Sequence, residues 1–164
     1  MIRHAKSSWE QEGVGDIDRP LSSRGRTDAA SLGHFLGKRR GTDLELLISS
    51  NALRARTTAQ LIAEALALSS SCLRGESRLY SAGVDDIIEV IRSLDDEARH
   101  VAIVGHNPAM HELAEACGCG SLEKFATCGA AHVRGRLASW RDFTPARVSF
   151  VEYVCPKLLS ADTC

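Results

Sequence analysis

Apolar and polar positions alternate along the chain in blocks that predict strands and helices in turn. Short apolar runs at 45–49 and 101–104 are typical of buried strands. The clearest helical spacing lies at 84–94, where one face collects Val84, Ile87, Ile88, Ile91 and Leu94. The same reading predicts further helices at 23–40, 52–68 and 108–118, further strands at 130–137 and 148–154, a brief extended piece at 78–81, and the end of a strand at 1–4.

Capping residues mark the expected ends of these helices. Ser22 or Ser23 can cap the first helix, with Gly41 as its stop. Ser50 or Asn51 is the expected cap of the second helix. The helix that follows the strand at 101–104 begins with Asn107 and Pro108, and proline is favoured at a first helical position.

Strands that alternate with helices predict an α/β layered domain with a mainly parallel sheet. The 164 residues fit one domain, and no linker, repeat or low-complexity tract divides residues 1–164. Ligands of such sheets bind beyond the carboxyl ends of the strands. The residues that directly follow each strand are therefore the candidates for chemistry.

Basic and imidazole side chains follow three of the predicted strands. Arg3 and His4 follow the first, and Arg54 and His106 follow the two buried strands. Each alone would be an ordinary surface residue, but together they suit phosphoryl transfer. Two guanidinium groups can hold a phosphoryl group, a neutral imidazole can attack phosphorus, and a second imidazole can donate to a phosphoryl oxygen. If the arginines and a protonated histidine supply the positive charge, neither a metal nor another cofactor is needed.

Charge and composition exclude several other classes of protein. Twenty Lys and Arg against 21 Asp and Glu give a net charge of −1, which provides no general attraction to nucleic acid or to an anionic membrane. The apolar runs are too short for a transmembrane helix. The six cysteines form no C-x-x-C pair and no secretory signal is present. We therefore expect a cytoplasmic protein with reduced thiols and no zinc site.

Several segments resemble the signatures of the histidine phosphatase superfamily, and in particular its SixA-type phosphohistidine phosphatases. Residues 1–9 (M-I-R-H-A-K-S-S-W) are similar to the opening motif, which reads R-H-A-K in this branch and R-H-G elsewhere. Residues 16–25 (D-I-D-R-P-L-S-S-R-G) resemble D-R-P-L-x-x-x-G, and residues 49–59 (S-S-N-A-L-R-A-R-T-T-A) resemble S-S-x-x-x-R-A-x-x-T-A. Residues 78–80 and 104–108 match as well. The resemblance covers nearly the whole chain.

The resemblance implies a fold and roles for particular residues. The expected fold is a three-layer α/β/α sandwich of the phosphoglycerate mutase type with a mainly parallel central sheet. His4 matches the nucleophile that is transiently phosphorylated, and Arg3, Arg54 and His106 match the rest of the catalytic phosphate pocket. Phosphate contacts are further expected from Asn107, Asp18 and Thr127. No metal or cofactor is implied.

The chain departs from the family pattern at two places. Only Met1 and Ile2 precede Arg3, which implies a first strand shortened at its N-terminus. The proton-donating Glu of the larger branches has no counterpart near Tyr80, and the next acid is Asp85. Phosphate esters with poor leaving groups need general acid help of about 10²–10⁴-fold, whereas the imidazole of phosphohistidine leaves easily.

These features favour a phosphatase for protein phosphohistidine, with a covalent phospho-His4 intermediate and inorganic phosphate as product. The expected partner is a phosphohistidine-bearing protein such as a histidine-phosphotransfer domain, and neither nucleic acid nor a membrane is expected. Two alternatives remain open from the sequence. One is a phosphomonoesterase for small molecules in the same superfamily, and the other is an inactive protein that only binds phosphate.

Overall fold

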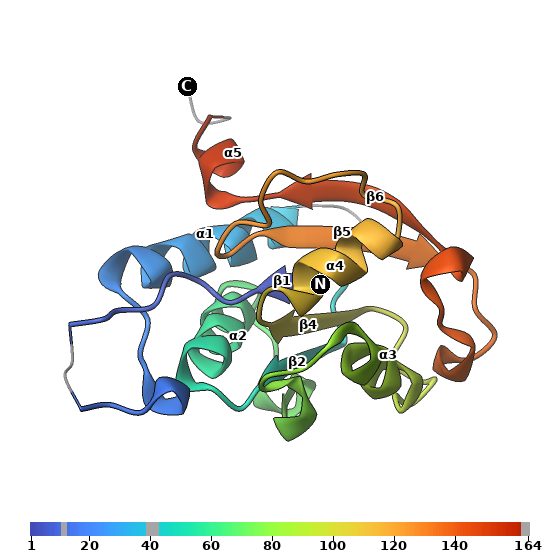
Figure 1. Cartoon of the computed structure of the whole chain (residues 1–164), viewed down its shortest axis with the longest axis horizontal. Coiled ribbons are helices and arrows are strands. Elements are labelled where there is room, and N and C mark those ends of the chain that lie inside the picture. The colour runs from blue at the N-terminus through green and yellow to red at the C-terminus, as the bar shows by residue number, and fades with distance from the viewer. Residues whose placement is uncertain (11–12, 39–42, 162–164) are drawn as a thin grey trace.

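The computed structural model describes residues 1–10, 13–38 and 43–161, and its core is a single six-stranded sheet (Figure 1). The strand order is β3-β2-β4-β1-β5-β6. β3, β2, β4 and β1 run parallel to one another; β5 pairs antiparallel with β1, and β6 pairs antiparallel with β5. The strands are β1 (Ile2–Arg3), β2 (Leu46–Ser50), β3 (Leu73–Glu76), β4 (Val101–Gly105), β5 (Ala130–Gly135) and β6 (Val148–Val154).

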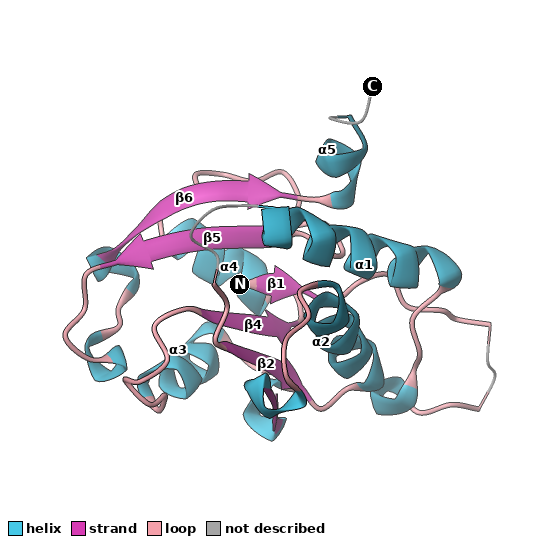
Figure 2. Cartoon of the chain, turned by 180° about the vertical axis from the view of Figure 1, so that it is seen from behind, coloured by secondary structure: helices cyan, strands magenta, loops and turns pink. Residues whose placement is uncertain are grey.

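Helices cover both faces of this sheet. α1 (Ser23–Lys38) and α2 (Leu53–Ala65) pack on one face, and α3 (Val84–Arg92) and α4 (Ala109–Ala116) on the other; α5 (Pro156–Ala161) follows β6 (Figures 1 and 2). The predicted mainly parallel α/β/α fold of the phosphoglycerate mutase type is therefore confirmed. None of the described helices has both the length and the apolar character that a membrane span requires.

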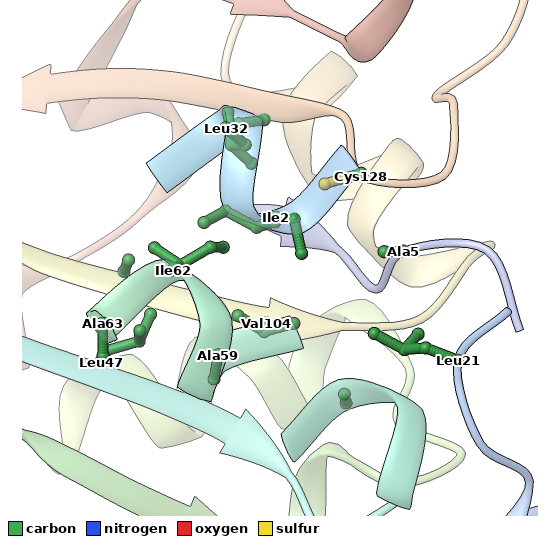
Figure 3. Packing of buried hydrophobic residues seen from close by; sticks show 14 of the residues in the cluster. Ile2, Ala5, Leu21, Leu32, Leu47, Ala59, Ile62, Ala63, Val104 and Cys128 are labelled. Atoms are coloured by element: carbon green, nitrogen blue, oxygen red, sulfur yellow. The ribbon is translucent and has the colours of Figure 1, made fainter. Parts of the chain in front are cut away.

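Alternate residues of the central strands supply two separate cores. Leu47 and Val104 point to the side of α1 and α2, where they meet Ile62, whereas Ile48 and Ile103 belong to the cluster beneath α3 and α4. Figure 3 shows the first cluster from close by. This alternation explains why the central strands are apolar at nearly every position, since both faces of a parallel sheet are buried.

The sequence prediction was wrong at β3. An extended piece was expected at 78–81, but the strand lies at Leu73–Glu76 and a 3₁₀ turn, Ser77–Leu79, follows it. β3 is an edge strand with partly exposed residues, so it carries no apolar run that would reveal it. The edge is ordered by parallel pairing with β2, which no local pattern encodes.

The expected helix ends are partly corrected. Ser22 caps α1, because its Oγ accepts from the Gly25 N–H at 3.1 Å; the expected stop at Gly41 lies outside the described residues. The N-cap of α2 is Ala52 rather than Ser50 or Asn51, and Ser50 Oγ accepts from the Ala52 N–H instead. α2 also ends at Ala65, earlier than predicted.

Gly25 brings the start of α1 against the segment that follows β1. A Cβ at this position would collide with the main-chain oxygen of Lys6. The same oxygen accepts hydrogen bonds from the N–H and the Oγ of Ser22. The absence of a side chain at Gly25 thus allows α1 to hold the chain immediately after His4.

Candidate active site

Three parallel strands end at the same edge of the sheet and bring their following residues together. β1 leads into His4, β4 leads into His106, and β2 ends at Ser50. The ring centroids of His4 and His106 lie 5.0 Å apart. His106 Nε2 is 2.9 Å from Ser50 Oγ, and His106 Nδ1 is 3.5 Å from a terminal nitrogen of Arg54. The structure therefore gathers His4, His106 and Arg54 as the sequence predicted.

The surroundings of His4 keep its imidazole neutral and set its tautomer. The ring is buried, and Nδ1 lies 2.8 Å from the main-chain oxygen of Ala5. A carbonyl oxygen only accepts, so Nδ1 carries the proton and Nε2 keeps a free lone pair. Burial lowers the pKa of His4 to about 3, and the charges of His106, Arg54 and Arg3 act in the same direction. The hydrogen bond to Ala5 raises the pKa but does not outweigh them. A neutral imidazole with a free Nε2 is the form that attacks phosphorus.

His106 is neutral at pH 7 as well. Burial and the charge of Arg54 lower its pKa to about 4, and the carboxylate of Asp16 opposes the shift only in part. A protonated histidine was considered as one source of positive charge, but with this pKa the ring of His106 is uncharged in the structure. The arginines supply the positive charge. Because a guanidinium group only donates, His106 Nδ1 accepts from Arg54, and the ring proton is on Nε2, which faces Ser50 Oγ.

Arg54 is held by Asp16, whereas the acidic residue expected near the pocket was Asp18. The Arg54 guanidinium donates to the Asp16 carboxylate at 2.9 Å and also to the Asp16 main-chain oxygen. Tyr80 donates its hydroxyl to the same carboxylate at 3.1 Å. Desolvation opposes ionisation, but these hydrogen bonds and charges lower the pKa of Asp16 overall. Both Asp16 and Asp18 are exposed, but Asp16 is the one that contacts Arg54, and the expected phosphate contact of Asp18 stays a prediction.

Asp16 could not be told from Asp18 by pattern, because both belong to one short 3₁₀ turn, Asp16–Asp18, that carries an acid at each end. Tyr80 belongs to residues 78–80, which resemble a segment of the histidine phosphatase superfamily. No role in the site was expected of its side chain. Its ring also packs edge-on against His106, with centroids 5.9 Å apart. Only the packing of the turn against α2 decides which acid faces Arg54.

Arg3 and Asn107 approach the site from the other side and share one acceptor. Arg3 donates to the main-chain oxygen of Phe125 at 2.8 Å, and Asn107 Nδ2 donates to the same oxygen at 3.2 Å. Phe125 is fully buried, so this carbonyl is a rigid anchor. Nothing in the sequence pointed to it, because it lies more than 120 residues from Arg3 along the chain.

Several buried N–H groups have no partner within the described protein, which favours an anion as the ligand of this site. The Nε atoms of Arg3 and Arg54 are buried without a hydrogen-bond partner, and so are Nε and Nη1 of Arg19. Buried donors are normally satisfied, and a phosphoryl group offers the acceptors that guanidinium groups prefer. The Oδ1 atom of Asn107 is also buried without a partner, but as an acceptor it does not suit an anion.

Two threonines border the nucleophile in different ways. Thr58 is fully buried, and its Oγ1 accepts from the Ala5 N–H at 3.0 Å and donates to the Arg54 carbonyl at 2.6 Å. It therefore fixes the backbone after His4 to helix α2, a positioning role that we had not predicted. Thr127 precedes Cys128, whose N–H donates to the carbonyls of Arg3 and His4. Its backbone is thus close to His4, and the phosphate contact expected of its side chain stays a prediction.

Metal ligands are not concentrated anywhere in the described part of the chain. No group of three or more His, Cys, Asp or Glu residues there could hold a metal ion. The candidate site itself offers two imidazoles, three guanidinium groups and one carboxylate that is already paired with Arg54. This donor set suits an anion better than a cation.

The depressed pKa values of His4 and His106 predict acid sensitivity of the fold. Both rings take up protons in the unfolded chain near pH 6.5, but in the folded protein only near pH 3 and pH 4. Stability is thus unaffected at pH 7 and falls as pH drops below 6.5. We expect a loss of about 3–5 kcal/mol in the free energy of unfolding by pH 4, after allowance for partial exposure.

Urea unfolding at pH 7, 6, 5 and 4 measures this effect. Carboxylates with lowered pKa values, such as Asp16, add acid sensitivity of the same sign. The His4→Gln variant is therefore the proper comparison, because it keeps the carboxylates and removes one buried imidazole. Its stability should fall less steeply with pH than that of the wild type. Parallel curves for the two proteins would show that His4 is not responsible.

Comparison with known proteins agrees with this fold. The family model described as histidine phosphatase superfamily (branch 1) matches residues 1–79. An uncharacterized protein of Mycobacterium tuberculosis is 32% identical over 167 residues, which cover 95% of this chain and 100% of that protein. A SixA protein from Agrobacterium tumefaciens, named as a candidate phosphohistidine phosphatase, superposes with a TM-score of 0.77 at 27% identity, covering 94% of this chain and 95% of that one.

A further solved structure, the protein histidine phosphatase SixA in complex with tungstate, shares the fold with a TM-score of 0.78 at 22% identity, over 96% of each chain. A phosphatase is the class of protein that this fold and these relatives define. The chain belongs to the histidine phosphatase superfamily and is of the SixA type.

Proposed function

We propose that this phosphatase removes the phosphoryl group from phosphohistidine on a protein through a covalent phospho-His4 intermediate. The observation that carries the proposal is the state of His4. Its Nδ1 proton is bound to Ala5, its Nε2 lone pair is free, and its low pKa keeps the ring neutral. Unpartnered guanidinium donors of Arg3 and Arg54 lie in the same site.

Two displacements at phosphorus complete the proposed reaction. In the first, Nε2 of His4 forms a bond to phosphorus in line with the breaking P–N bond, and the substrate imidazole leaves and takes up a proton. Arg3 and Arg54 stabilise the equatorial oxygens, and His106 can turn its Nε2–H, which faces Ser50 Oγ in the structure, to one of them. In the second, water attacks phospho-His4, the P–N bond to His4 breaks, and inorganic phosphate is released.

The state of Asp16 supports cleavage of a P–N bond over a P–O bond. An ester with a poor leaving group needs a protonated acid beside the leaving oxygen, which contributes about 10²–10⁴-fold. Asp16 is the carboxyl group that contacts Arg54, and the hydrogen bonds from Arg54 and Tyr80 keep it ionised. An ionised carboxylate cannot donate that proton. The imidazole of phosphohistidine needs much less help to leave.

The loop beside the site supports a substrate carried by a protein. Trp9 is 80% exposed, and Val14 and Ile17 are also exposed, on the segment that bears Asp16. The Arg19 guanidinium packs 3.7 Å from the centre of the Trp9 ring. Exposed apolar side chains next to a binding site are typical of protein contacts. A phosphohistidine-bearing protein, such as a histidine-phosphotransfer domain, is the partner that we propose.

The SixA relatives point in the same direction. Solved structures at 26–27% identity are named as candidate phosphohistidine phosphatases. The SixA structure with tungstate shows that a protein of this fold accepts a phosphate-like oxyanion. These names describe the relatives, and for this chain they support the proposal that rests on His4, Arg3 and Arg54.

The test compares phosphate release from a protein carrying radiolabelled phosphohistidine with release from p-nitrophenyl phosphate. We expect release from phosphohistidine together with acid-labile label trapped on the wild-type enzyme, and neither in His4→Ala. Faster turnover of p-nitrophenyl phosphate would instead favour a small-molecule phosphomonoesterase. Folded protein that binds tungstate but releases no phosphate from either compound would indicate an inactive phosphate-binding protein.

A further inference from the structure

A carboxylate of the protein itself occupies part of the candidate anion site. Asp16 opens the 3₁₀ turn Asp16–Asp18, and its Oδ2 accepts from Nη2 of Arg54 at 2.9 Å. The neighbouring Nη1 of Arg54 donates to the main-chain oxygen of Asp16. An incoming phosphoryl group is also an anion and binds to the same kind of donor. Asp16 and a phosphoryl group are therefore competitors for Arg54.

The competition concerns one edge of the Arg54 guanidinium group. Nε and Nη2 direct N–H bonds to the same edge, where two parallel hydrogen bonds can hold two oxygens of a phosphoryl group. Nε is buried without a partner, whereas Nη2 is bound to the Asp16 carboxylate. This edge is complete for a phosphoryl group only after the carboxylate has left Nη2. The bond from Nη1 to the Asp16 main-chain oxygen does not use this edge and can remain.

Arg19 offers the Asp16 carboxylate a second position. Nη2 of Arg19 lies 3.3 Å from Oδ1 of Asp16. Two further donors of Arg19, Nε and Nη1, are buried without a partner in the described structure. Its guanidinium group is held in place by stacking, 3.7 Å from the centre of the Trp9 ring. Arg19 can therefore bind the carboxylate more fully when Arg54 is taken by another anion.

The Asp16 side chain can change partner without disturbing the core. It is 52% exposed, against 6% for Arg54, and none of the three residues of its turn is buried. Rotation about its side-chain bonds therefore displaces no packed residue. Tyr80 also donates to Oδ2, and its hydroxyl can turn to water once the carboxylate has moved.

We propose that Asp16 is a specificity-determining residue that holds the phosphate-binding edge of Arg54 in the absence of substrate and passes to Arg19 when a phosphoryl group binds. Every oxyanion then has to displace a carboxylate before it reaches Nη2 of Arg54. Small phosphate esters and inorganic phosphate have only their own oxygens for this exchange. A phosphoryl group carried by a protein adds contacts elsewhere, and binding energy from remote contacts can offset the displacement. This inference rests on the proposed function for its protein-borne substrate.

The turn lies where a protein substrate would supply such contacts. Val14 and Ile17 stand on either side of Asp16 in the sequence, and each is 40% exposed. Exposed apolar side chains beside a binding site are typical of protein contacts. A protein bound over them gains affinity at the segment that carries Asp16, which a small phosphate does not.

Equilibrium titration with tungstate tests the competition without turnover. Asp16→Asn keeps the size of the side chain and removes its charge, and we expect it to bind tungstate about 10-fold more tightly than the wild type. Asp85→Asn makes the same change at an exposed position of α3 and should leave the affinity unchanged. Equal or weaker binding by Asp16→Asn would overturn the proposal.

Arg19→Gln tests the transfer of the carboxylate. Without the Arg19 guanidinium group, the carboxylate has lost its second position and stays on Arg54, so tungstate affinity should fall about 5-fold. In the Asp16→Asn background the loss should shrink to less than about twofold, because no carboxylate remains to be moved. An equal loss in both backgrounds would show that Arg19 binds the oxyanion itself, and the transfer would be wrong.

Turnover extends the test to the class of substrate. Asp16→Asn should raise kcat/KM about 10-fold for free phosphohistidine, but less than about threefold for phosphohistidine on a protein, which already has remote contacts. An equal gain for both would reduce Asp16 to a source of charge repulsion and refute its role in specificity. If the wild type released no phosphate from phosphohistidine, the proposed function would fail, and the tungstate titrations would still decide whether Asp16 competes for Arg54.

Discussion

Replacement of His4 by glutamine is expected to reduce phosphate release from phosphohistidine by about 10⁴–10⁶-fold, the range that removal of a catalytic nucleophile produces. Glutamine has a similar size and can keep a donor toward the Ala5 oxygen, but its amide cannot form the phosphorylated intermediate. The protein should remain folded, because the change creates neither a cavity nor a buried charge. Single-turnover assays with trapping of the acid-labile label measure both the rate and the intermediate.

The matched control is His34→Gln, which makes the same change at an exposed position of α1. It should retain wild-type activity. If the His4 variant kept more than about a hundredth of the wild-type rate, the loss would be small enough for general acid–base catalysis alone to explain it. The proposed covalent role of His4 would then be wrong. Label trapped on the variant would lead to the same conclusion.

Replacement of Arg54 by lysine is expected to lower kcat/KM for phosphohistidine by about 10²–10³-fold, the effect of removing one preorganised donor to a developing anion. Arg54 is 5% exposed and binds Asp16 through both terminal nitrogens. Lysine preserves the charge but cannot hold Asp16 and a phosphoryl oxygen in the same fixed plane. Affinity for tungstate should fall with the activity, which equilibrium titration can measure.

Arg56→Lys is the control for this change. Arg56 lies two residues further along α2 and is exposed, so its replacement should leave activity and tungstate binding unchanged. Equal losses in both variants would assign the effect to helix α2 as a whole. Retained tungstate affinity in Arg54→Lys would contradict an oxyanion-binding role for the guanidinium group.

Much of the site could be predicted because the residues that carry it follow strands. In a parallel sheet the carboxyl ends of neighbouring strands meet, so Arg3, His4 and His106 could be placed at one edge from the sequence alone. Arg54 could be added because the first turn of a helix after a strand starts from the same edge. The pattern of neighbouring residues along the chain is sufficient to place such residues in the site.

Other parts of the site depend on contacts between distant segments. The choice between Asp16 and Asp18 is decided by how one short turn packs against α2, and both residues have the same local signature. The hydrogen bond from Arg3 to the Phe125 oxygen joins residues 122 positions apart. Its acceptor is a main-chain atom, which every residue has, so the residue type at 125 could not indicate it. The edge strand β3 was missed for a similar reason, since its order comes from pairing with β2.

The sequence by itself determined the α/β alternation, the parallel core strands and the four residues that we expect to perform the chemistry, because apolar periodicity and position after a strand are local properties. Only the tertiary structure decided the charge state of the two histidines and the tautomer of His4. Burial and the approach of Arg54 and Arg3 lower both pKa values, and the Ala5 carbonyl leaves the nucleophilic nitrogen free. Desolvation and hydrogen-bond direction arise from the packing of distant segments.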